Sequence, residues 1–186
     1  MTRHVWPRMP FNGAAGRFGG SEQGVTLIEF ALIFPFMILL FIGLVEFGEA
    51  FSVNRKISNA ASTVSDLISQ EASVNNAQLQ DLTIVAGEIV KPYRTAPLSL
   101  RVISVVANDA NTSATVEWTY PAGGPAVGSV YPLPEGGRMT EPNSSLVVAE
   151  TSYAFTPSVG YFVGAITLNG IAYFRPRMGR TVTKTD

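Results

Sequence analysis

The sequence predicts an α+β fold in which a long amino-terminal transmembrane and amphipathic helix, plus a second helix, pack on a roughly four-stranded antiparallel sheet. Three observations predict it. Residues 25–45 form an almost uninterrupted apolar run, the following residues keep an amphipathic helical pattern to about residue 70, and from residue 98 apolar and polar side chains alternate. Apolar periods near 3.6 and 2 residues are typical of helices and of half-buried strands.

The composition excludes several classes of function. Thirteen Lys and Arg against 14 Asp and Glu give a net charge of −1, so no basic field predicts binding to nucleic acid. The absence of cysteine excludes disulfides and thiolate metal sites. The single histidine, His4, is too little for a Ser-His-Asp triad or a multi-histidine metal site. We therefore expect no enzyme activity, no catalytic residues, no metal and no cofactor.

Residues 1–24 are expected to be a basic leader without packed structure. Arg3, Arg8 and Arg17 are its cations and Glu22 is its only acid, while five glycines and two prolines interrupt it. No apolar period persists long enough to form a packed element.

Residues 25–45 are expected to form a transmembrane helix. Glu29 is their only charged residue, and 21 residues at about 1.5 Å each span roughly 30 Å, the thickness of a bilayer core. The alternative is a buried core helix, but a small domain rarely surrounds so long an apolar helix on all sides. Pro35 lies inside the segment, where its missing N–H and its ring predict a helix kink of the kind tolerated in membranes.

The charges on either side of this segment predict its orientation. Arginines precede it, and Glu46 and Glu49 follow it, so the positive-inside rule places the amino terminus in the cytoplasm. A cleavable secretory signal is the alternative, because Gly48-Glu49-Ala50 offers small residues at a suitable spacing. The apolar run is longer than the roughly 7–15 residues of such a signal, and the helical pattern continues beyond it.

Residues 71–186 are expected to form an extracytoplasmic α+β domain. The stripe of apolar residues that continues the first helix would pack against it; its members are Val53, Ile57, Ala60, Ala61, Val64, Leu67 and Ile68. A second helix is predicted over residues 73–91 and ends before Pro92. Strands are predicted at 98–107, 114–120, 146–155 and 165–174, with a turn at 108–112, a long loop at 121–144 and a short solvated tail from Arg175 to Arg180.

The stretch Gly24-Val25-Thr26-Leu27-Ile28-Glu29-Phe30, where the leader meets the apolar run, resembles the processing site of type IV prepilins and pseudopilins. The wider stretch from Glu29 to Gly48 looks like the TadE-like pseudopilins (TadE/TadG family) of the tight-adherence (Tad) pilus. So do Tyr173-Phe-Arg-Pro-Arg177 and Thr181-Val-Thr183. These chains usually carry tyrosine after the glutamate, whereas this one has Phe30, a departure that bears on the efficiency of processing.

This resemblance implies a pilin-like fold and a minor pseudopilin, a structural and assembly component of Tad pilus biogenesis and adhesion. A prepilin peptidase would cut between Gly24 and Val25. The other implied partners are pilus or pseudopilin subunits, the inner-membrane assembly platform and membrane lipid. The protein would be a single-pass inner-membrane protein with a periplasmic carboxy-terminal domain, either incorporated in the pilus or retained at the membrane. The alternative is an unprocessed, membrane-anchored extracytoplasmic binding module.

Glu29 is the candidate for charge pairing during assembly. A charged side chain near the centre of a bilayer costs about 3 kcal/mol, and the apolar run offers it no partner. Cleavage after Gly24 would create one, the α-ammonium of Val25, four residues and therefore one helical turn away. The ammonium of a neighbouring subunit could serve in the same way. The alternative is that Glu29 lies at the headgroup boundary and is solvated.

Overall fold

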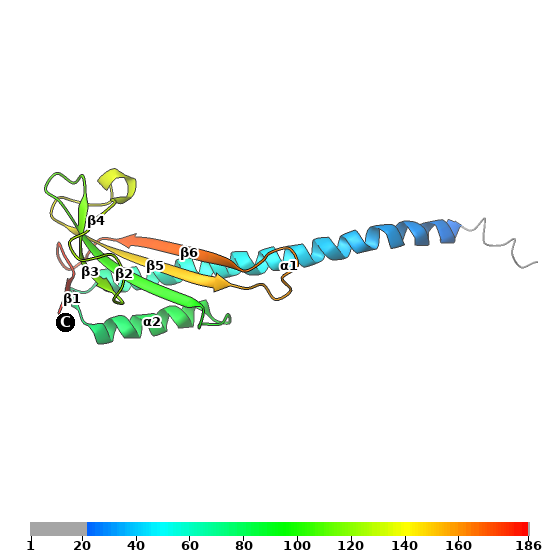
Figure 1. The fold of residues 1–186 in the computed structure, drawn as a ribbon, viewed down its shortest axis with the longest axis horizontal. Helices are drawn as coiled ribbons and strands as arrows, with labels where there is room; N and C mark the ends of the chain where they lie inside the picture. The colour runs from blue at the N-terminus through cyan, green and yellow to red at the C-terminus, as the bar shows by residue number, and fades with distance from the viewer. Residues whose placement is uncertain (1–21, 186) are drawn as a thin grey trace, which may run out of the picture. The chain divides into compact units, whose positions relative to one another are not determined.

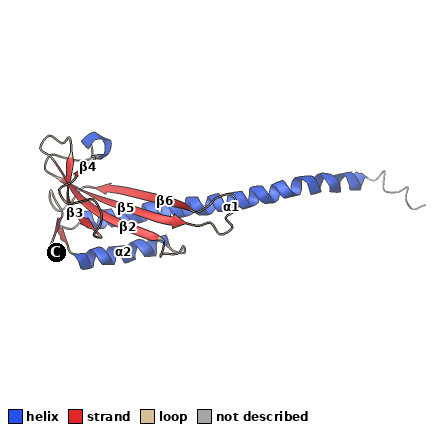
Figure 2. Ribbon diagram, in the orientation of Figure 1, coloured by secondary structure: helices blue, strands red, loops and turns tan. Residues whose placement is uncertain are grey.

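The computed structural model describes residues 22–185. Helix α1 spans Glu22–Ser69 and helix α2 spans Asn76–Val90. The strands are β1 (Ser73–Val74), β2 (Leu98–Ala107), β3 (Ala114–Tyr120), β4 (Val130–Tyr131), β5 (Ser145–Phe155), β6 (Ile166–Phe174) and β7 (Thr183–Lys184), and one 3-10 turn, η2, spans Pro134–Gly137 (Figures 1 and 2). The α+β class with a long amino-terminal helix is confirmed.

The chain divides into two compact units between Ile42 and Gly43, so helix α1 contributes to both. Over the described residues, the first unit is the helical segment 22–42. The second unit, residues 43–186, contains the rest of α1 together with α2 and the strands.

The main sheet has five strands in the order β4-β3-β2-β5-β6, and all neighbours are antiparallel. The four strands expected from the sequence are present within a residue of their predicted bounds. The prediction missed β4, which pairs with β3 from within the supposed loop 121–144, and the parallel pair of β1 and β7. Strands of two residues have no alternation to detect, which explains both omissions.

One face of the sheet is covered by the second half of α1. Six of the seven predicted stripe residues are fully buried; Leu67 alone is partly exposed. The Ser65 hydroxyl donates to the carbonyl of Val147 (3.0 Å), and the Thr151 hydroxyl donates to the carbonyl of Ile57 (3.0 Å). A Cβ on Gly170 would lie 3.1 Å from the backbone of Ser58. The helix and β6 therefore approach closely because position 170 carries no side chain.

Helix α2 begins later than predicted because Ser73 is recruited into β1. Asn75 is its N-cap, and the side chains of Asn75 and Gln78 form a capping box. Leu79, Ala86 and Val90 bury its apolar side in the same core. At its carboxyl end, the ammonium of Lys56 on α1 donates to the carbonyls of Ile89 and Lys91, where a cation complements the helix dipole.

The opposite face of the sheet carries a smaller core. Its buried residues are Ile103, Val105, Ala114, Val116, Leu146 and Val148. Tyr131 and Leu133, from the segment between β3 and β5, pack against it together with Tyr173. The Pro- and Gly-rich segment 121–144 therefore covers part of this face, although the sequence predicts only a loop there.

Residues 175–180 are mostly exposed, as expected for a short solvated tail, but the chain is anchored at Arg177 and is packed beyond Arg180. Val182 is fully buried and its carbonyl accepts the indole N–H of Trp118 at 2.7 Å. Arg177 pairs with Asp66 of α1, and its backbone N–H donates to the carbonyl of Ser69. The basic composition gave no sign of this packing, because the guanidinium groups lie at the surface while the backbone N–H of Arg177 binds the last residue of α1.

Candidate membrane anchor and the glutamate at its end

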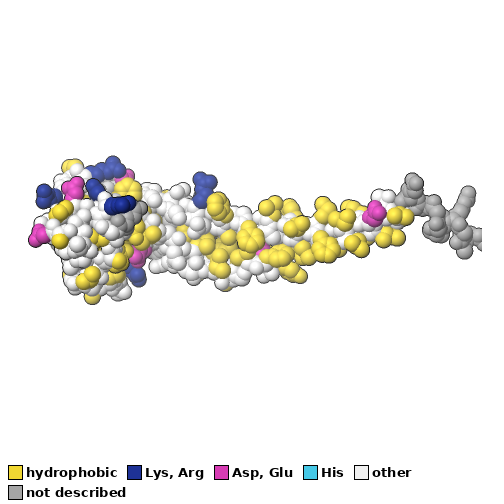
Figure 3. Space-filling view, turned by 90° about the horizontal axis from the view of Figure 1, so that it is seen from above, with side chains coloured by type: hydrophobic (Ala, Val, Ile, Leu, Met, Phe, Trp, Pro, Cys, Tyr) yellow, Lys and Arg dark blue, Asp and Glu magenta, His cyan; other side chains and the backbone are white. Residues whose placement is uncertain are grey.

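The described residues contain one helix that is long and apolar enough to cross a membrane, and none of its most apolar window is buried. Leu40, for example, is 74% exposed. In the view of Figure 3, hydrophobic side chains cover this helical segment, while most charged side chains gather on the remainder. A core helix would be enclosed by its own domain, so that alternative is removed. The segment fits a single-pass membrane anchor.

The residues predicted for processing and assembly lie at the start of this helix. Because α1 begins at Glu22, the bond between Gly24 and Val25 lies in its first turn. Gly24, Val25 and Glu29 are all exposed. Glu29 lies one turn beyond Val25, and its side chain makes no hydrogen bond or ion pair to the residues that the structure describes.

Two further sequence predictions concern the leader and Pro35. Residues 1–21, with the three arginines and His4, lie outside the described residues. Pro35 lies in the interior of α1, which continues past it. Phe30 and Phe34, one turn apart before Pro35, bring their rings to 5.3 Å between centroids.

Glu46 follows the apolar run directly and is the most enclosed acid in the described chain. Its side chain is only 1% exposed. One carboxylate oxygen accepts the backbone N–H of Tyr161 (2.7 Å), and the other accepts those of Phe162 (2.9 Å) and Val163 (2.8 Å). These donors come from the connection between β5 and β6, more than 100 residues downstream. The carboxylate therefore fastens that connection to the helix; we call this arrangement the Glu46 clamp.

The β5–β6 connection, residues 156–165, is built to bind this anion. Gly160 has φ +68°, a left-handed conformation that favours glycine. It precedes three consecutive N–H groups that converge on one carboxylate, the arrangement known as an anion-binding nest. One turn further along α1, Glu49 accepts the backbone N–H and the hydroxyl of Ser158. Two acids on one side of the helix thus hold one loop.

Burial alone would raise the pKa of the Glu46 carboxyl, which lies just outside the apolar segment. The N–H groups of Tyr161, Val163, Phe162 and Gly160 outweigh burial, and the pKa lies below its ordinary value. Donors aimed at a carboxylate favour its charged form. Glu46 is therefore a buried anion at neutral pH, with its charge satisfied by backbone dipoles.

Sequence reasoning used Glu46 only as a charge that follows the anchor. A signal for its burial was present: Glu46 lies seven residues before Val53 and eleven before Ile57, which places it on the buried stripe of α1. A charged residue on such a stripe predicts a partner. The identity of that partner, residues 161–163, could not be predicted from local sequence.

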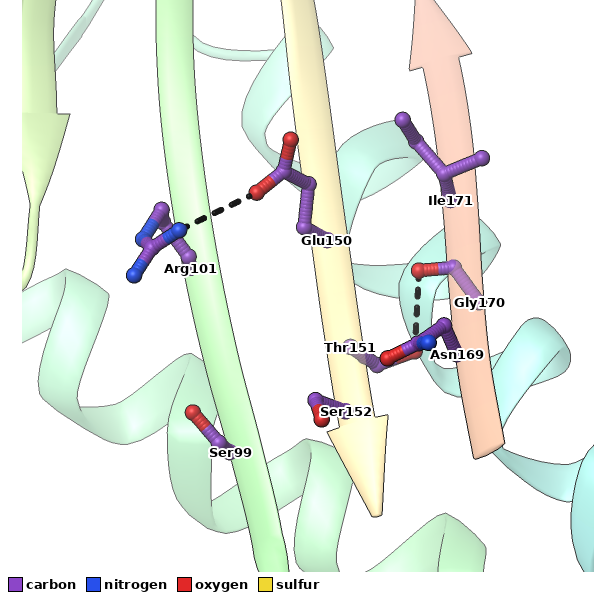
Figure 4. A pocket seen from close by; sticks show the side chains of 8 residues that line it. All are labelled: Ser99, Arg101, Glu150, Thr151, Ser152, Asn169, Gly170 and Ile171. Carbon is purple, nitrogen blue, oxygen red and sulfur yellow. Dashed lines mark hydrogen bonds and ion pairs between the residues drawn. The ribbon is translucent and has the colours of Figure 1, made fainter. Parts of the chain in front are cut away.

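A shallow hollow of about 570 Å³ lies on the open part of the second sheet face. Figure 4 shows its lining from β2, β5 and β6, with Arg101 turned toward Glu150 on the neighbouring strand. Arg101 pairs with Glu150 at 3.4 Å, and the Tyr131 hydroxyl donates to the same carboxylate at 3.3 Å. Burial of this phenol, with Glu150 and Tyr173 nearby, raises the pKa of Tyr131. These polar groups satisfy one another.

No group of three or more His, Cys, Asp or Glu side chains within the described range lies close enough together to hold a metal ion. The acids that do cluster, Glu46 and Glu49, bind backbone and hydroxyl donors of the β5–β6 connection. Their chemistry is that of structural anions.

Comparison with known proteins adds one family match. Residues 24–66 match the family model described as TadE-like protein. Over this stretch the match confirms the resemblance to TadE-like proteins, a family associated with the Tad pilus; it does not test the processing site. It begins at Gly24, includes Glu29, Pro35 and Glu46, and ends on the buried stripe of α1, before the first strand. No curated protein and no solved structure matches the chain.

Proposed function

We propose that this chain is a minor pseudopilin, a structural and assembly component of Tad-type pilus biogenesis rather than an enzyme. The observation that carries the proposal is the exposed apolar helix, which starts with Gly24 and Glu29 and lies inside the TadE-like match. The α+β domain that follows would be the part presented to other subunits.

The covalent event in this proposal is one in which the protein is the substrate. A prepilin peptidase would hydrolyse the bond between Gly24 and Val25, leaving a carboxylate on Gly24 and an α-ammonium on Val25. The bond lies in the first turn of α1, where helix ends fray and can open to a protease. The leader would then be lost, and the mature chain would begin with the apolar helix.

Processing would give Glu29 the partner that it lacks among the described residues. Side chains of a helix lean toward its amino end, so Glu29 leans toward the new ammonium one turn away. A carboxylate in the first turns of a helix is also favoured by the helix dipole. The same carboxylate could reach the ammonium of an adjacent subunit, which would set the axial register of assembly.

The proposed orientation has the leader in the cytoplasm and residues 43–186 in the periplasm. It is supported by the arginines of the leader and by Glu46 and Glu49 beyond the apolar run. A periplasm-active reporter fused after Asp186 should be active, and one fused within the first 20 residues should be silent. The opposite pattern would contradict a pseudopilin.

A matched pair of variants tests the processing site against the pairing role. Gly24→Leu should leave a full-length precursor. Glu29→Ala should still be inserted and cleaved, because the glycine and basic leader define the cut, but surface pili should be reduced. Blotting for the precursor and mature forms measures cleavage, and a count of surface pili measures assembly. A mature band of normal size from Gly24→Leu would remove the processing site, and normal piliation in Glu29→Ala would remove the pairing role.

The alternative is an unprocessed, membrane-anchored binding module. The hollow of Figure 4 is the place to look for its ligand, but its Arg101 and Glu150 are paired with each other. A precursor that is never shortened in the wild-type strain would favour this alternative over the pseudopilin.

A further inference from the structure

We propose that the β5–β6 connection, residues 156–165, is a membrane-interface loop. It would insert its aromatic side chains among lipid headgroups beside the point where α1 leaves the bilayer. This inference depends on insertion of the apolar helix into a membrane and does not depend on cleavage at Gly24. It assigns lipid contact to a loop of the carboxy-terminal unit and accounts for the exposed apolar side chains of that loop.

The connection exposes apolar side chains where a solvated loop would not. Tyr161 is 68% exposed, and Val159 and Phe162 are also exposed. Around the end of the apolar run, α1 also exposes Leu44, Phe47 and Phe51. All of these residues lie in the unit 43–186. We call the three exposed apolar side chains of the connection, Val159, Tyr161 and Phe162, the exit patch; exposed apolar side chains that gather in this way mark an interaction surface.

Contact between Phe162 and Gly43 sets the level of the loop relative to the membrane. A Cβ on Gly43 would lie 3.6 Å from the ring of Phe162, so the ring packs directly on the helix there. Gly43 is two residues inside the apolar run that ends at Val45, or about 3 Å along the helix axis. If the run spans the bilayer, Phe162 must lie at the depth of its last turn.

The Glu46 clamp keeps the loop at that level. Its three N–H bonds, and those of Ser158 to Glu49, tie four residues of the connection to one turn of α1. These bonds use backbone N–H groups and the Ser158 hydroxyl, so the side chains of Val159, Tyr161 and Phe162 take no part in them and stay exposed. Tyr161 and Phe162 contact each other edge to face at 5.2 Å between centroids.

Lipid is the occupant that these features favour. Phe162 packs on Gly43 in the last turns of the apolar run, and aromatic side chains are enriched where helices leave a bilayer, with Tyr placing its hydroxyl among headgroups. Residues 43–54 and 156–165 contain no Lys or Arg, so the attraction is apolar rather than electrostatic. A zwitterionic membrane should therefore suffice, and added salt should not release the loop.

The experiment uses the full chain in phosphatidylcholine vesicles. The chain has no cysteine, so a single Val159→Cys carries one bimane label and leaves both aromatic residues in place. Quenching by brominated phosphatidylcholine reports contact with lipid. The matched control is Val130→Cys on β4, where the native side chain is 74% exposed at the opposite end of the same unit (Figure 1). Leu40→Cys reports insertion of the anchor.

We expect severalfold stronger quenching at position 159 than at position 130, with position 40 quenched most. Replacing Tyr161 and Phe162 by serine should reduce quenching at 159. Glu46→Gln should do the same by loosening the clamp, whereas Glu88→Gln on the exposed side of α2 should have no effect. Equal quenching at 159 and 130, with position 40 quenched, would overturn the inference and leave the pseudopilin proposal intact.

Two other outcomes would also overturn it. In the first, the label at position 159 is not quenched by brominated lipid, and its protection from water increases with the protein-to-lipid ratio. That result would assign the exit patch to contact between copies of the chain. Absence of quenching at position 40 would remove the membrane anchor itself, and with it both proposals.

Discussion

Glu29 lies near the start of the apolar run and Glu46 directly follows its end, and the two glutamates have opposite surroundings. Glu46 is enclosed and accepts three backbone N–H groups of its own chain. Glu29 is exposed and pairs with none of the described residues. The two ends of the run thus differ in their partners: at one end folding supplies them, and at the other none of the described residues does, which is why we propose that processing or another subunit supplies one.

The same division runs through the helix around them. From residue 22 to 42, α1 exposes large apolar side chains on all sides, whereas from Val53 onward it buries one stripe against the sheet. One helix therefore has two environments, an exposed apolar half and a half packed on the sheet. The effect of a substitution on folding stability should depend on the half in which it lies.

Removing the buried stripe should abolish folding. A fragment of residues 50–186 retains the stripe and should be soluble and monomeric. A fragment of residues 71–186 loses Val53, Ile57 and Val64 from the core, exposes one face of the sheet and should aggregate. Size-exclusion chromatography of the two fragments distinguishes them. Identical behaviour would mean that α1 does not contribute a wall of the core.

Truncating one side chain in each half of α1 should affect the free energy of unfolding only in the half that packs on the sheet. Ile57→Ala removes a fully buried side chain and should lower the free energy of unfolding by about 2–5 kcal/mol. Ile38→Ala, in the exposed apolar half, should leave it unchanged. Denaturant unfolding of the full chain in detergent micelles measures both. A comparable loss from both variants would contradict the division.

The two glycines Gly170 and Gly48 offer a smaller version of the same contrast. A methyl group at 170 would meet the Thr151 hydroxyl oxygen at 2.6 Å and the backbone of Ser58 at 3.1 Å, so Gly170→Ala should destabilise by about 1–3 kcal/mol. Gly48 has nothing within 4 Å of that position, and Gly48→Ala should stabilise the helix by at most about 1 kcal/mol. Thermal unfolding should show a lower melting temperature for Gly170→Ala and an equal or slightly higher one for Gly48→Ala.

Acid should open the Glu46 clamp only at low pH. The folded-state pKa of Glu46 lies below its ordinary value of 4.5, so its contribution to stability is complete above pH 4.5 and is lost as the pH falls through the folded pKa. Amide exchange at residues 161–163 should stay slow at pH 5 and accelerate, after correction for intrinsic rates, well below pH 4.5. In Glu46→Gln this acid-dependent step should be absent. Its persistence would assign the transition to another group.

Periodicity was enough to predict most of this fold. The stripe from Val53 to Ile68 and the alternation from Ala114 to Tyr120 each report burial through a repeated pattern, and both proved correct. Contacts made by one or two residues leave no such pattern. The pairing of β1 with β7, the strand β4 and the burial of Val182 all depend on segments brought together by the rest of the fold.

The candidate site divides in the same way. Gly24, Val25, Glu29 and Pro35 were identified from the local motif, and their placement on an exposed helix follows from the apolar run around them. Glu46 lies on a buried stripe that the sequence displays, but its donors at 161–163 come from more than 100 residues away. Sequence could signal that Glu46 needs a partner and could not name one.

We propose that the two glutamates differ because processing, not folding, supplies the partner of Glu29. The amino-terminal sequence of the protein extracted from the membranes of its own cells tests this proposal. A mature chain that begins Val25-Thr26-Leu27-Ile28-Glu29 is the predicted result, with the new ammonium one turn from the carboxylate. A chain that still begins at Met1 in cells that carry active prepilin peptidase would contradict it.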